Sequence, residues 1–391
     1  VDDILDKGFN PRLKLYFVEK KLNRLKLKQL HCDSILLAVT IILVLIGLVM
    51  VFSSSGVYAM EKYNDAYYFL KRQVVWAALG AMIMLSARKM DYRNLEKYTY
   101  YIMGLVFLML LAVMIPGFGK EVGGARRWLV LGGFTFQPSE LAKFALILFI
   151  AKSLVKRSDQ LKNFAYGYLP KLIVLSFFFL PILFQPDFGT AITICAVTFT
   201  MLMLAGLRSK FLIYSILVIV PLFTIAIMNA EYRMRRIVAF LNPWEHESNA
   251  GFQVIQSFYA FGRGGVFGSG IGSSSQKLFY LPEAHTDFIF SVIGEELGFT
   301  GALIIIILFS MLIWRGFFIA YHAKDSFGVH VAIGLTLLIG IQAFMNMGVT
   351  VGLLPTKGLT LPFVSMGGSS LVVLMLSIGV LLNISEKPIQ K

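Results

Sequence analysis

The sequence predicts an all-α integral membrane protein, a bundle of about ten transmembrane helices with a long extracytoplasmic loop between spans 7 and 8. Two observations support this fold class. Hydrophobic residues make up 57% of the 391 residues and charged residues only 15%, whereas a soluble domain carries about 25% charged residues. The hydrophobic residues also stand in long blocks, and a helix needs roughly 20 apolar residues to cross the hydrocarbon core.

Ten such blocks follow one another along the chain, and we interpret each as a span. Three of them, those beginning at Val74, Leu141 and Leu172, are short, so nine or eleven spans remain alternatives. In chain order the blocks are Ile35–Ser53, Val74–Ala87, Tyr98–Ile115, Leu141–Leu154, Leu172–Phe184, Phe188–Leu207, Phe211–Met228, Phe288–Trp314, Val329–Met347 and Leu361–Ile384.

The net charge is +14, and the basic residues behind it are divided unevenly between the two sides of the membrane. With the N-terminus in the cytoplasm, the cytoplasmic segments hold 23 Lys and Arg residues and the opposite side holds 12. A cytoplasmic excess of basic residues is the positive-inside rule. The charge therefore predicts two cytoplasmic termini and contact with anionic lipid, and it does not indicate nucleic-acid binding.

Four regions follow from this topology. Residues 1–34 are a basic cytoplasmic segment, either an interfacial amphipathic helix or a disordered tail. The polytopic membrane domain takes 35–384, including the large extracytoplasmic loop at 229–287, and 385–391 form a cytoplasmic tail. We find no internal repeat of the kind that many transporters carry. Because long ordered loops are usually functional, we expect any chemistry on the outer side.

Asp287 is the first candidate for that chemistry, at the outer mouth of the predicted eighth span. Aspartate there could cap the helix N-terminus, or serve as a general base at the membrane surface, and the two roles are compatible. Neighbouring Glu283 and His285 keep the assignment open, with His285 better suited to a supporting hydrogen bond. Further along the same predicted helix, Glu295 and Glu296 are expected to be paired within the protein, because an unpaired charge at that depth is costly.

Lys143 is a second candidate, because it lies inside the predicted fourth span. Glu140, three residues earlier, could form a local ion pair with it. Asp187, at the start of the sixth span, could instead pair with Lys143 across the bundle, and we predict this second arrangement. Structural and substrate-facing roles remain equally open for the pair.

Arg126, Arg127 and Trp128 lie together on the outer side, where the positive-inside rule disfavours basic residues. Arginine binds phosphate oxygens bidentately, so these residues could recognise the diphosphate of an outward-facing lipid. Anchoring to headgroups is the alternative for each arginine. Two glycine-rich segments, Gly262–Ser275 and Ser365–Ser370, predict a close-packed loop and either a helix start or a cavity wall.

Taken together, these segments resemble the SEDS family (shape, elongation, division and sporulation proteins), and its cell-division members more than its elongation members. The motifs run in family order over nearly the whole chain; each is weak alone, but five in order are highly specific. Met366 stands where the family usually has Tyr. The motifs are Gly124-Ala-Arg-Arg-Trp128, Gln137-Pro-Ser-Glu-Leu-Ala-Lys143, Gln185-Pro-Asp-Phe-Gly-Thr190, Pro282-Glu-Ala-His-Thr-Asp287 with Ile293-Gly-Glu-Glu-Leu-Gly298, and Pro355-Thr-Lys-Gly-Leu-Thr-Leu-Pro362 with Gly367-Gly-Ser-Ser370.

The resemblance implies a peptidoglycan glycosyltransferase that polymerises lipid II at the outer face of the bacterial cytoplasmic membrane, at the division septum. Asp287 matches the family's catalytic aspartate and would act as the general base. A diphosphate leaves as an anion, so one base plus cations would suffice, whereas a glycosidase needs two carboxylates. We expect substrate contacts from the residues of the matched motifs, namely Arg126, Arg127, Trp128, Lys143, Asp187, Glu283, His285, Lys357 and Ser369.

The expected partners are lipid II, undecaprenyl-diphosphate-linked glycan, a cognate class B penicillin-binding protein transpeptidase, other divisome proteins and membrane lipid. The sequence identifies no cofactor with certainty; a divalent cation, Mg²⁺ or Mn²⁺, is a candidate for offsetting the diphosphate charge. A lipid II flippase and a non-catalytic divisome scaffold are the alternative functions. The missing repeat argues against a flippase, and the long outer loop that carries Asp287 argues for chemistry.

Overall fold

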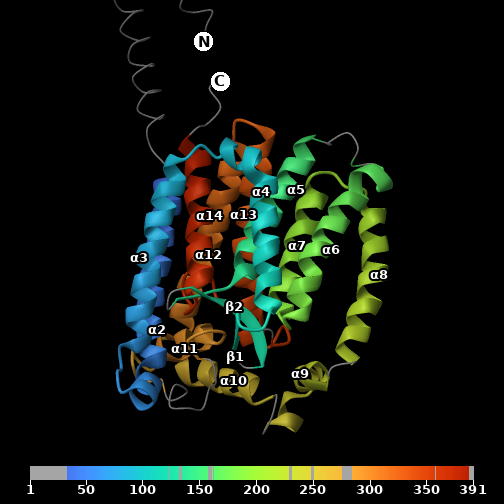
Figure 1. Ribbon diagram of the computed structural model, residues 1–391. Coiled ribbons are helices and arrows are strands. Elements are labelled where there is room, and N and C mark those ends of the chain that lie inside the picture. Colours follow the sequence, from blue (N-terminus) through green and yellow to red (C-terminus); the bar gives the residue numbers. More distant parts are fainter. Residues whose placement is uncertain are drawn as a thin grey trace, which may run out of the picture.

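Long apolar helices dominate the computed structural model of the protein (Figure 1). It describes residues 33–122, 124–131, 134–156, 161, 163–228, 231–247, 251–274, 284–356 and 358–386. Two candidate site residues, Glu283 and Lys357, lie outside these residues, as do the leader before Asp33 and the tail after Glu386.

Each of the ten predicted spans coincides with a helix or a helix pair. Seven helices among the described residues are long and apolar enough to cross a membrane, so the all-α membrane fold is confirmed and the count of ten stays a prediction. The helices of the bundle are α2 (Ser34–Tyr63), α3 (Tyr68–Lys89), α4 (Arg93–Met114), α5 (Pro138–Lys156), the π-helix η3 (Phe164–Tyr168) continued by α6 (Leu169–Phe184), α7 (Phe188–Leu204), α8 (Ser209–Met228), α11 (Ile289–Glu296), α12 (Gly298–Tyr321), α13 (Ser326–Thr350) and α14 (Gly368–Glu386).

The first and last of these helices meet at one end of the bundle, at the top of Figure 1. Asp33 caps α2 by accepting a hydrogen bond from Leu36 N at 2.9 Å, and its own backbone nitrogen donates to Ser385 Oγ at the end of α14, 3.3 Å away. Arg315 of α12 forms an ion pair with the same Asp33 carboxylate. The two described chain ends therefore lie on the same side of the bundle.

The opposite end carries the long connections. The segment before α5, for which the sequence indicated no regular structure, forms an antiparallel sheet of β1 (Gly119–Val122), β2 (Ala125–Leu131) and β3 (Phe134–Phe136). Among its described residues, the predicted loop at 229–287 contains three helices: α9 (Glu231–Leu241), the 3₁₀-helix η4 (Pro243–His246) and α10 (Phe252–Gly264). Helices α9 and α10 lie across this end of the bundle (Figure 1).

The predicted eighth span is not one continuous helix. It breaks between α11 and α12 at Gly298, whose φ of 68° is left-handed and therefore favours glycine. The glycine-rich segment after α10 fills the break: Gly270 N donates to Glu296 O at 3.0 Å, and Phe299 N donates to Gly265 O at 2.9 Å. The prediction of a close-packed loop was correct, and that of an unbroken helix over Phe288–Trp314 was wrong.

The last span starts later than predicted. Helix α14 begins at Gly368, and the residues from Leu361 to Gly367 form a turn in which Ser365 N donates to Leu361 O at 3.0 Å. Gly47 of α2 approaches this turn so closely that a Cβ there would lie 2.6 Å from Phe363 O. The turn is thus packed inside the bundle at the end that carries Asp287.

Candidate active site

Asp287 stands just before α11 and is partly buried. The predicted N-cap role is not what the structure has, because Phe288 occupies that position and no side chain caps the helix. The backbone around Asp287 is fixed instead by side chains from elsewhere in the bundle. Asn346 Nδ2 donates to Asp287 O at 2.8 Å, and Ser365 Oγ donates to Thr286 O at 2.5 Å.

The segment Gly358–Ser365 forms one wall around Asp287. A Cβ placed on Gly358 would lie 3.5 Å from Asp287 Oδ2, so this backbone passes beside the carboxylate. Three buried side-chain amides hold the segment by donating to its carbonyl oxygens: Asn346 to Leu359 at 2.6 Å, Gln342 to Thr360 at 3.2 Å, and Gln73 to Ser365 at 3.2 Å.

Sequence reasoning missed Gln73, Gln342 and Asn346. Each is about 1% exposed, and each lies on a helix that crosses the bundle. A buried polar group without a hydrogen bond is costly. Carboxamides inside apolar spans therefore indicate residues that bind a polar group within the bundle. The sequence alone did not show which carbonyl groups they bind.

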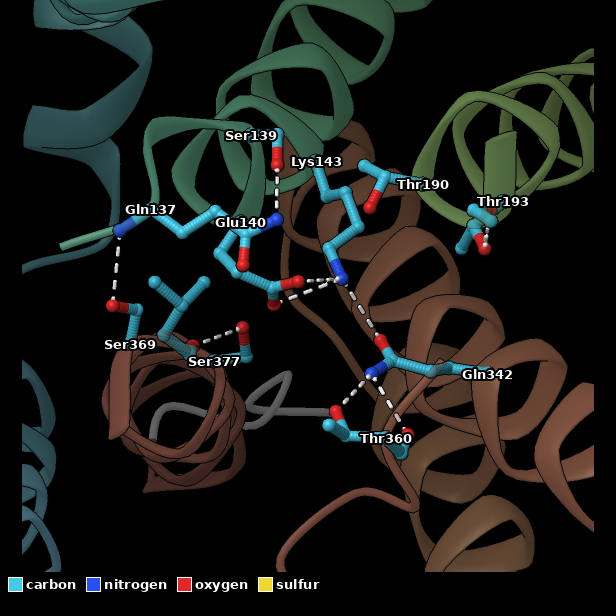
Figure 2. Close-up of polar contacts among 12 residues, drawn as sticks. Gln137, Ser139, Glu140, Lys143, Thr190, Thr193, Gln342, Thr360, Ser369 and Ser377 are labelled. Atoms are coloured by element: carbon cyan, nitrogen blue, oxygen red, sulfur yellow. Dashed lines mark hydrogen bonds and ion pairs between the residues drawn. The ribbon is translucent and has the colours of Figure 1, made fainter. Parts of the chain in front are cut away.

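Lys143 pairs with Glu140 and not with Asp187, so the predicted pair across the bundle was wrong. Lys143 Nζ lies 2.9 Å from the Glu140 carboxylate and donates to Gln342 Oε1 at 3.0 Å. Figure 2 shows the chain of contacts from Glu140 through Lys143 and Gln342 to Thr360. A buried ion pair in α5 is thereby connected to the segment beside Asp287.

Asp187 caps α7 at its outer end. Its carboxylate accepts from Thr190 N at 3.2 Å, from Gln137 Nε2 at 3.0 Å and from Ser139 Oγ at 3.1 Å. It is only 2% exposed. The charge is satisfied by hydrogen-bond donors at the start of α5 and in its own helix, which explains why it does not need Lys143.

The two arginines of β2 have different partners. Arg127 donates from Nε to Gln185 O at 2.9 Å and from Nη2 to Pro186 O, so it ties the sheet to the turn before α7. Arg126 is exposed and pairs with Glu121 on β1 at 3.0 Å. Trp128 lies opposite Lys120 in the sheet and is half-buried. Arg126 is the more exposed of the two arginines.

Glu295 and Glu296 are buried where α11 ends, and serines bind both carboxylates, as expected for structural pairing. Ser53 Oγ of α2 lies 2.7 Å from both Glu296 oxygens, while Ser274 Oγ donates to Glu295 Oε2. These contacts join α2 and the glycine-rich segment to the helix break. Ser291, earlier in α11, shares a hydrogen bond of 2.6 Å with Ser257 of α10.

His285 and Ser369 lie at the two edges of this site. The His285 ring packs on Phe69 with centroids 4.8 Å apart, and its backbone oxygen accepts from Met366 N at 2.9 Å. Ser369 is buried and its Oγ accepts from Gln137 N at 3.0 Å (Figure 2). Met366 therefore contributes a backbone hydrogen bond at the position where the resemblance led us to expect Tyr.

The described residues contain no group of three or more His, Cys, Asp or Glu side chains placed to hold a metal ion. Mg²⁺ usually binds proteins through one or two carboxylates together with waters and substrate phosphates. A divalent cation at this site stays a prediction from the sequence.

Comparison with known proteins gives concordant matches. The chain matches the FtsW, RodA and SpoVE family of cell cycle proteins over residues 33–389. It is 47% identical over 365 residues to the probable peptidoglycan glycosyltransferase FtsW of Geobacter metallireducens, covering 93% of this chain and 97% of that protein. It is 43% identical over 359 residues to stage V sporulation protein E of Bacillus subtilis, covering 92% and 98%.

Solved structures share the fold. A chain from a peptidoglycan synthase complex that coordinates polymerization and crosslinking superposes with a TM-score of 0.75 at 30% identity, over 93% of this chain and 100% of that one. The rod shape determining protein RodA of Thermus thermophilus gives a TM-score of 0.69 at 28% identity, over 93% and 99%. With a family match from residue 33 to 389 and these apolar helices, the chain belongs to the FtsW, RodA and SpoVE family of cell cycle proteins and is a multi-pass protein of the bacterial inner membrane.

Proposed function

We propose that the chain is a peptidoglycan glycosyltransferase that polymerises lipid II into glycan strands at the outer face of the cytoplasmic membrane during cell division. The observation that carries this proposal is the placement of Asp287. Its backbone is held by Asn346 of α13 at 2.8 Å, its carboxylate lies beside Gly358, and it occupies the position of the catalytic aspartate in the family it resembles. The similar Geobacter proteins, named probable peptidoglycan glycosyltransferase FtsW, support the same activity.

In the proposed reaction, the 4-hydroxyl of an acceptor N-acetylglucosamine attacks the anomeric carbon of the donor glycan. Asp287 takes the hydroxyl proton as the new C–O bond forms, and the bond to the diphosphate breaks with its electron pair going to the leaving oxygen. An ionised aspartate side chain is a hydrogen-bond acceptor only, so the carboxylate can take up this proton. General-base catalysis contributes about 10²–10⁴-fold.

We assign the substrate contacts by exposure. Arg126 is exposed and paired only at the surface, where an ion pair is worth at most about 1 kcal/mol, so it can exchange Glu121 for a diphosphate. Lys357 directly precedes Gly358, and Glu283 stands two positions before His285; we propose that both contact the substrate, beside His285 and Trp128.

Four residues of the predicted set support the site from within the protein. Arg127, Lys143, Asp187 and Ser369 each form hydrogen bonds to neighbouring elements, and the last three are buried. We propose that they hold α5, α7 and α14 around the substrate. An apolar groove beside α2, lined by Phe52, Met60 and Ile271 among others, suits the isoprenoid chain of the lipid.

A cognate class B penicillin-binding protein transpeptidase at the septum is the proposed partner. The similar chain from a peptidoglycan synthase complex that coordinates polymerization and crosslinking supports this assignment. Such a partner would receive glycan strands as they leave the polymerase.

The test is glycan synthesis by the purified protein in detergent, with lipid II as substrate and with or without the partner. A polymerase forms glycan chains, since no membrane has to be crossed. A flippase or a non-catalytic scaffold forms none. Absence of glycan in both conditions, from protein that is folded and binds lipid II, would contradict the proposal.

A further inference from the structure

Asn346 is a buried amide on α13 that binds two carbonyl groups at once. Its Nδ2 donates to Asp287 O at 2.8 Å and to Leu359 O at 2.6 Å, and the residue is 1% exposed. Carbonyl oxygens only accept hydrogen bonds. The side chain must therefore point its NH₂ group at both, because the flipped amide would put Oδ1 against two acceptors.

The contact from Asn346 comes from a regular helix, whereas the contact from Ser365 comes from a connecting segment. Ser365, which holds Thr286 O, lies in the turn before α14 and is itself part of a connecting segment. Asn346 lies within α13, a helix of 25 residues that runs from Ser326 to Thr350. Sites supported by regular elements are held more precisely than sites supported by loops.

Both segments bound by Asn346 border the Asp287 carboxylate. One carries Asp287 itself, and the other continues from Gly358, whose Cβ position lies 3.5 Å from Asp287 Oδ2. One side chain on α13 thus binds both segments, which Ser365 also joins through Thr286 O. A misplacement of 1 Å at a reacting group can cost about 10²-fold in rate.

We propose that Asn346 is a positioning residue, which holds Asp287 and the Gly358–Ser365 segment in register so that the carboxylate meets the acceptor hydroxyl. This inference rests on the proposed function, in which Asp287 is the general base. Asn346 does not touch the reacting atoms in this account. Its loss should lower turnover while lipid II still binds.

The experiment compares Asn346→Ala and Asn346→Asp with the control Asn383→Ala. Asn346→Asp keeps the size of the side chain but, when ionised, faces two carbonyl oxygens without a proton to donate. Asn383, near the end of α14 opposite Asp287, is a matched buried asparagine: it is 2% exposed and donates to Arg88 O at 2.6 Å. All three variants should lose thermal stability. Because this loss is shared, a difference in kcat between them reports positioning and not folding.

We expect both Asn346 variants to lower kcat by about tenfold or more, within the range that misplacement produces, and to change KM for lipid II less than about twofold. Asn383→Ala, normalised to folded protein, should keep kcat within about twofold of the unchanged protein. If Asn346→Ala does not fold, Asn346→Ser retains one donor and should show a smaller loss of kcat. Equal kcat values for the Asn346 variants and the Asn383 control would overturn the proposal, as would a loss confined to KM.

Asp287→Asn in the same assay separates this inference from the proposed function. If Asp287→Asn is inactive while Asn346→Ala matches the control, only the positioning role is wrong. If Asp287→Asn polymerises normally, the general base has been misassigned, and the positioning role fails with it.

Discussion

Lys143 and Glu140 form an ion pair inside α5, with Lys143 Nζ 2.9 Å from Glu140 Oε2 and both side chains almost fully buried. Gln342 of α13 accepts a further hydrogen bond from Lys143 at 3.0 Å. The pair therefore connects two helices of the bundle by charge and hydrogen bonding where most neighbours are apolar.

Removing one partner of this pair should destabilise the protein more than removing both. Lys143→Met leaves the Glu140 carboxylate buried without its counter-ion, and breaking a buried pair in this way costs roughly 3–5 kcal/mol. Adding Glu140→Gln removes the orphaned charge, so the double variant should recover most of the loss. Thermal unfolding in detergent measures both. A double variant that unfolds as early as Lys143→Met would contradict this account of the pair.

Gly298 should tolerate no side chain. Its φ is 68°, where a non-glycine residue costs about 1–2 kcal/mol, and a Cβ would lie 2.3 Å from Gly268 N. Gly298→Ala should therefore lower thermal stability clearly. Gly104 of α4 is the matched control, because nothing lies within 4 Å of its Cβ position and alanine favours a helix by about 1 kcal/mol. Equal melting temperatures for the two variants would show that the close approach of Gly298 to Gly268 does not constrain the fold.

The bundle could be predicted from the sequence because blocks of apolar residues are a strong signal of span length. The local pairing of Glu140 with Lys143 could also be predicted, since residues three apart on a helix are neighbours. The pairing of Lys143 with Asp187 was wrong because hydropathy gives the depth of a residue in the membrane but not the direction in which its helix face points. The Asp187 carboxylate accepts hydrogen bonds from Gln137 and Ser139 instead.

Two further features could not be predicted for a different reason. The segment from Phe288 to Trp314 is mostly apolar, with Glu295 and Glu296 as its charged residues, and a glycine within a helical pattern is usually tolerated. The break at Gly298 exists because a distant segment, Gly265–Gly270, supplies its hydrogen bonds. Likewise, the role of Asn346 depends on two carbonyl groups that only the folded chain brings together.

The contacts of Asp325 predict a dependence of stability on acid pH. Burial alone would raise the pKa of this carboxyl, but hydrogen bonds from Tyr92, Gly328 N and Arg93 outweigh it and hold the pKa below its ordinary value. A lowered pKa stabilises the fold above the pKa of the unfolded state, about 3.9, and this contribution is lost as the pH falls through the folded value.

Asp325→Asn should therefore show a smaller drop in melting temperature than the unchanged protein between pH 5 and pH 3. The asparagine can still accept a hydrogen bond at the N-cap of α13, where Gly328 N lies 2.7 Å from the present carboxylate. Parallel melting curves measured by differential scanning fluorimetry across this range would show that Asp325 does not contribute.

Both chain ends should face the cytoplasm, as the distribution of 23 and 12 basic residues predicts. The close approach of Asp33 N and Ser385 Oγ, 3.3 Å apart, places the described ends on one side. With Cys32 and Cys195 replaced, single cysteines near residues 245 or 270 should react with an impermeant reagent added outside, and those near 20 or 390 should not. The reverse labelling pattern would overturn the orientation and place Asp287 on the wrong side for an outward reaction.

Asp287→Asn should abolish polymerisation without unfolding the protein. The amide has the size of the carboxylate, and no capping bond is lost, because Phe288 and not Asp287 occupies the N-cap of α11. The backbone contact from Asn346 to Asp287 O is also retained, since it does not involve the side chain of Asp287. What the amide cannot do is accept the proton of the attacking hydroxyl.

The expected loss is roughly 100-fold or more in polymerisation, the scale of general-base catalysis, with lipid II binding largely preserved. Melting temperature and glycan synthesis should be measured on the same preparation, so that a loss of folded protein is not mistaken for a loss of chemistry. A structural role predicts that activity and stability fall together. Normal glycan synthesis by folded Asp287→Asn would exclude it as the base, and Glu283, the nearest other acidic residue in that motif, would then be the residue to replace.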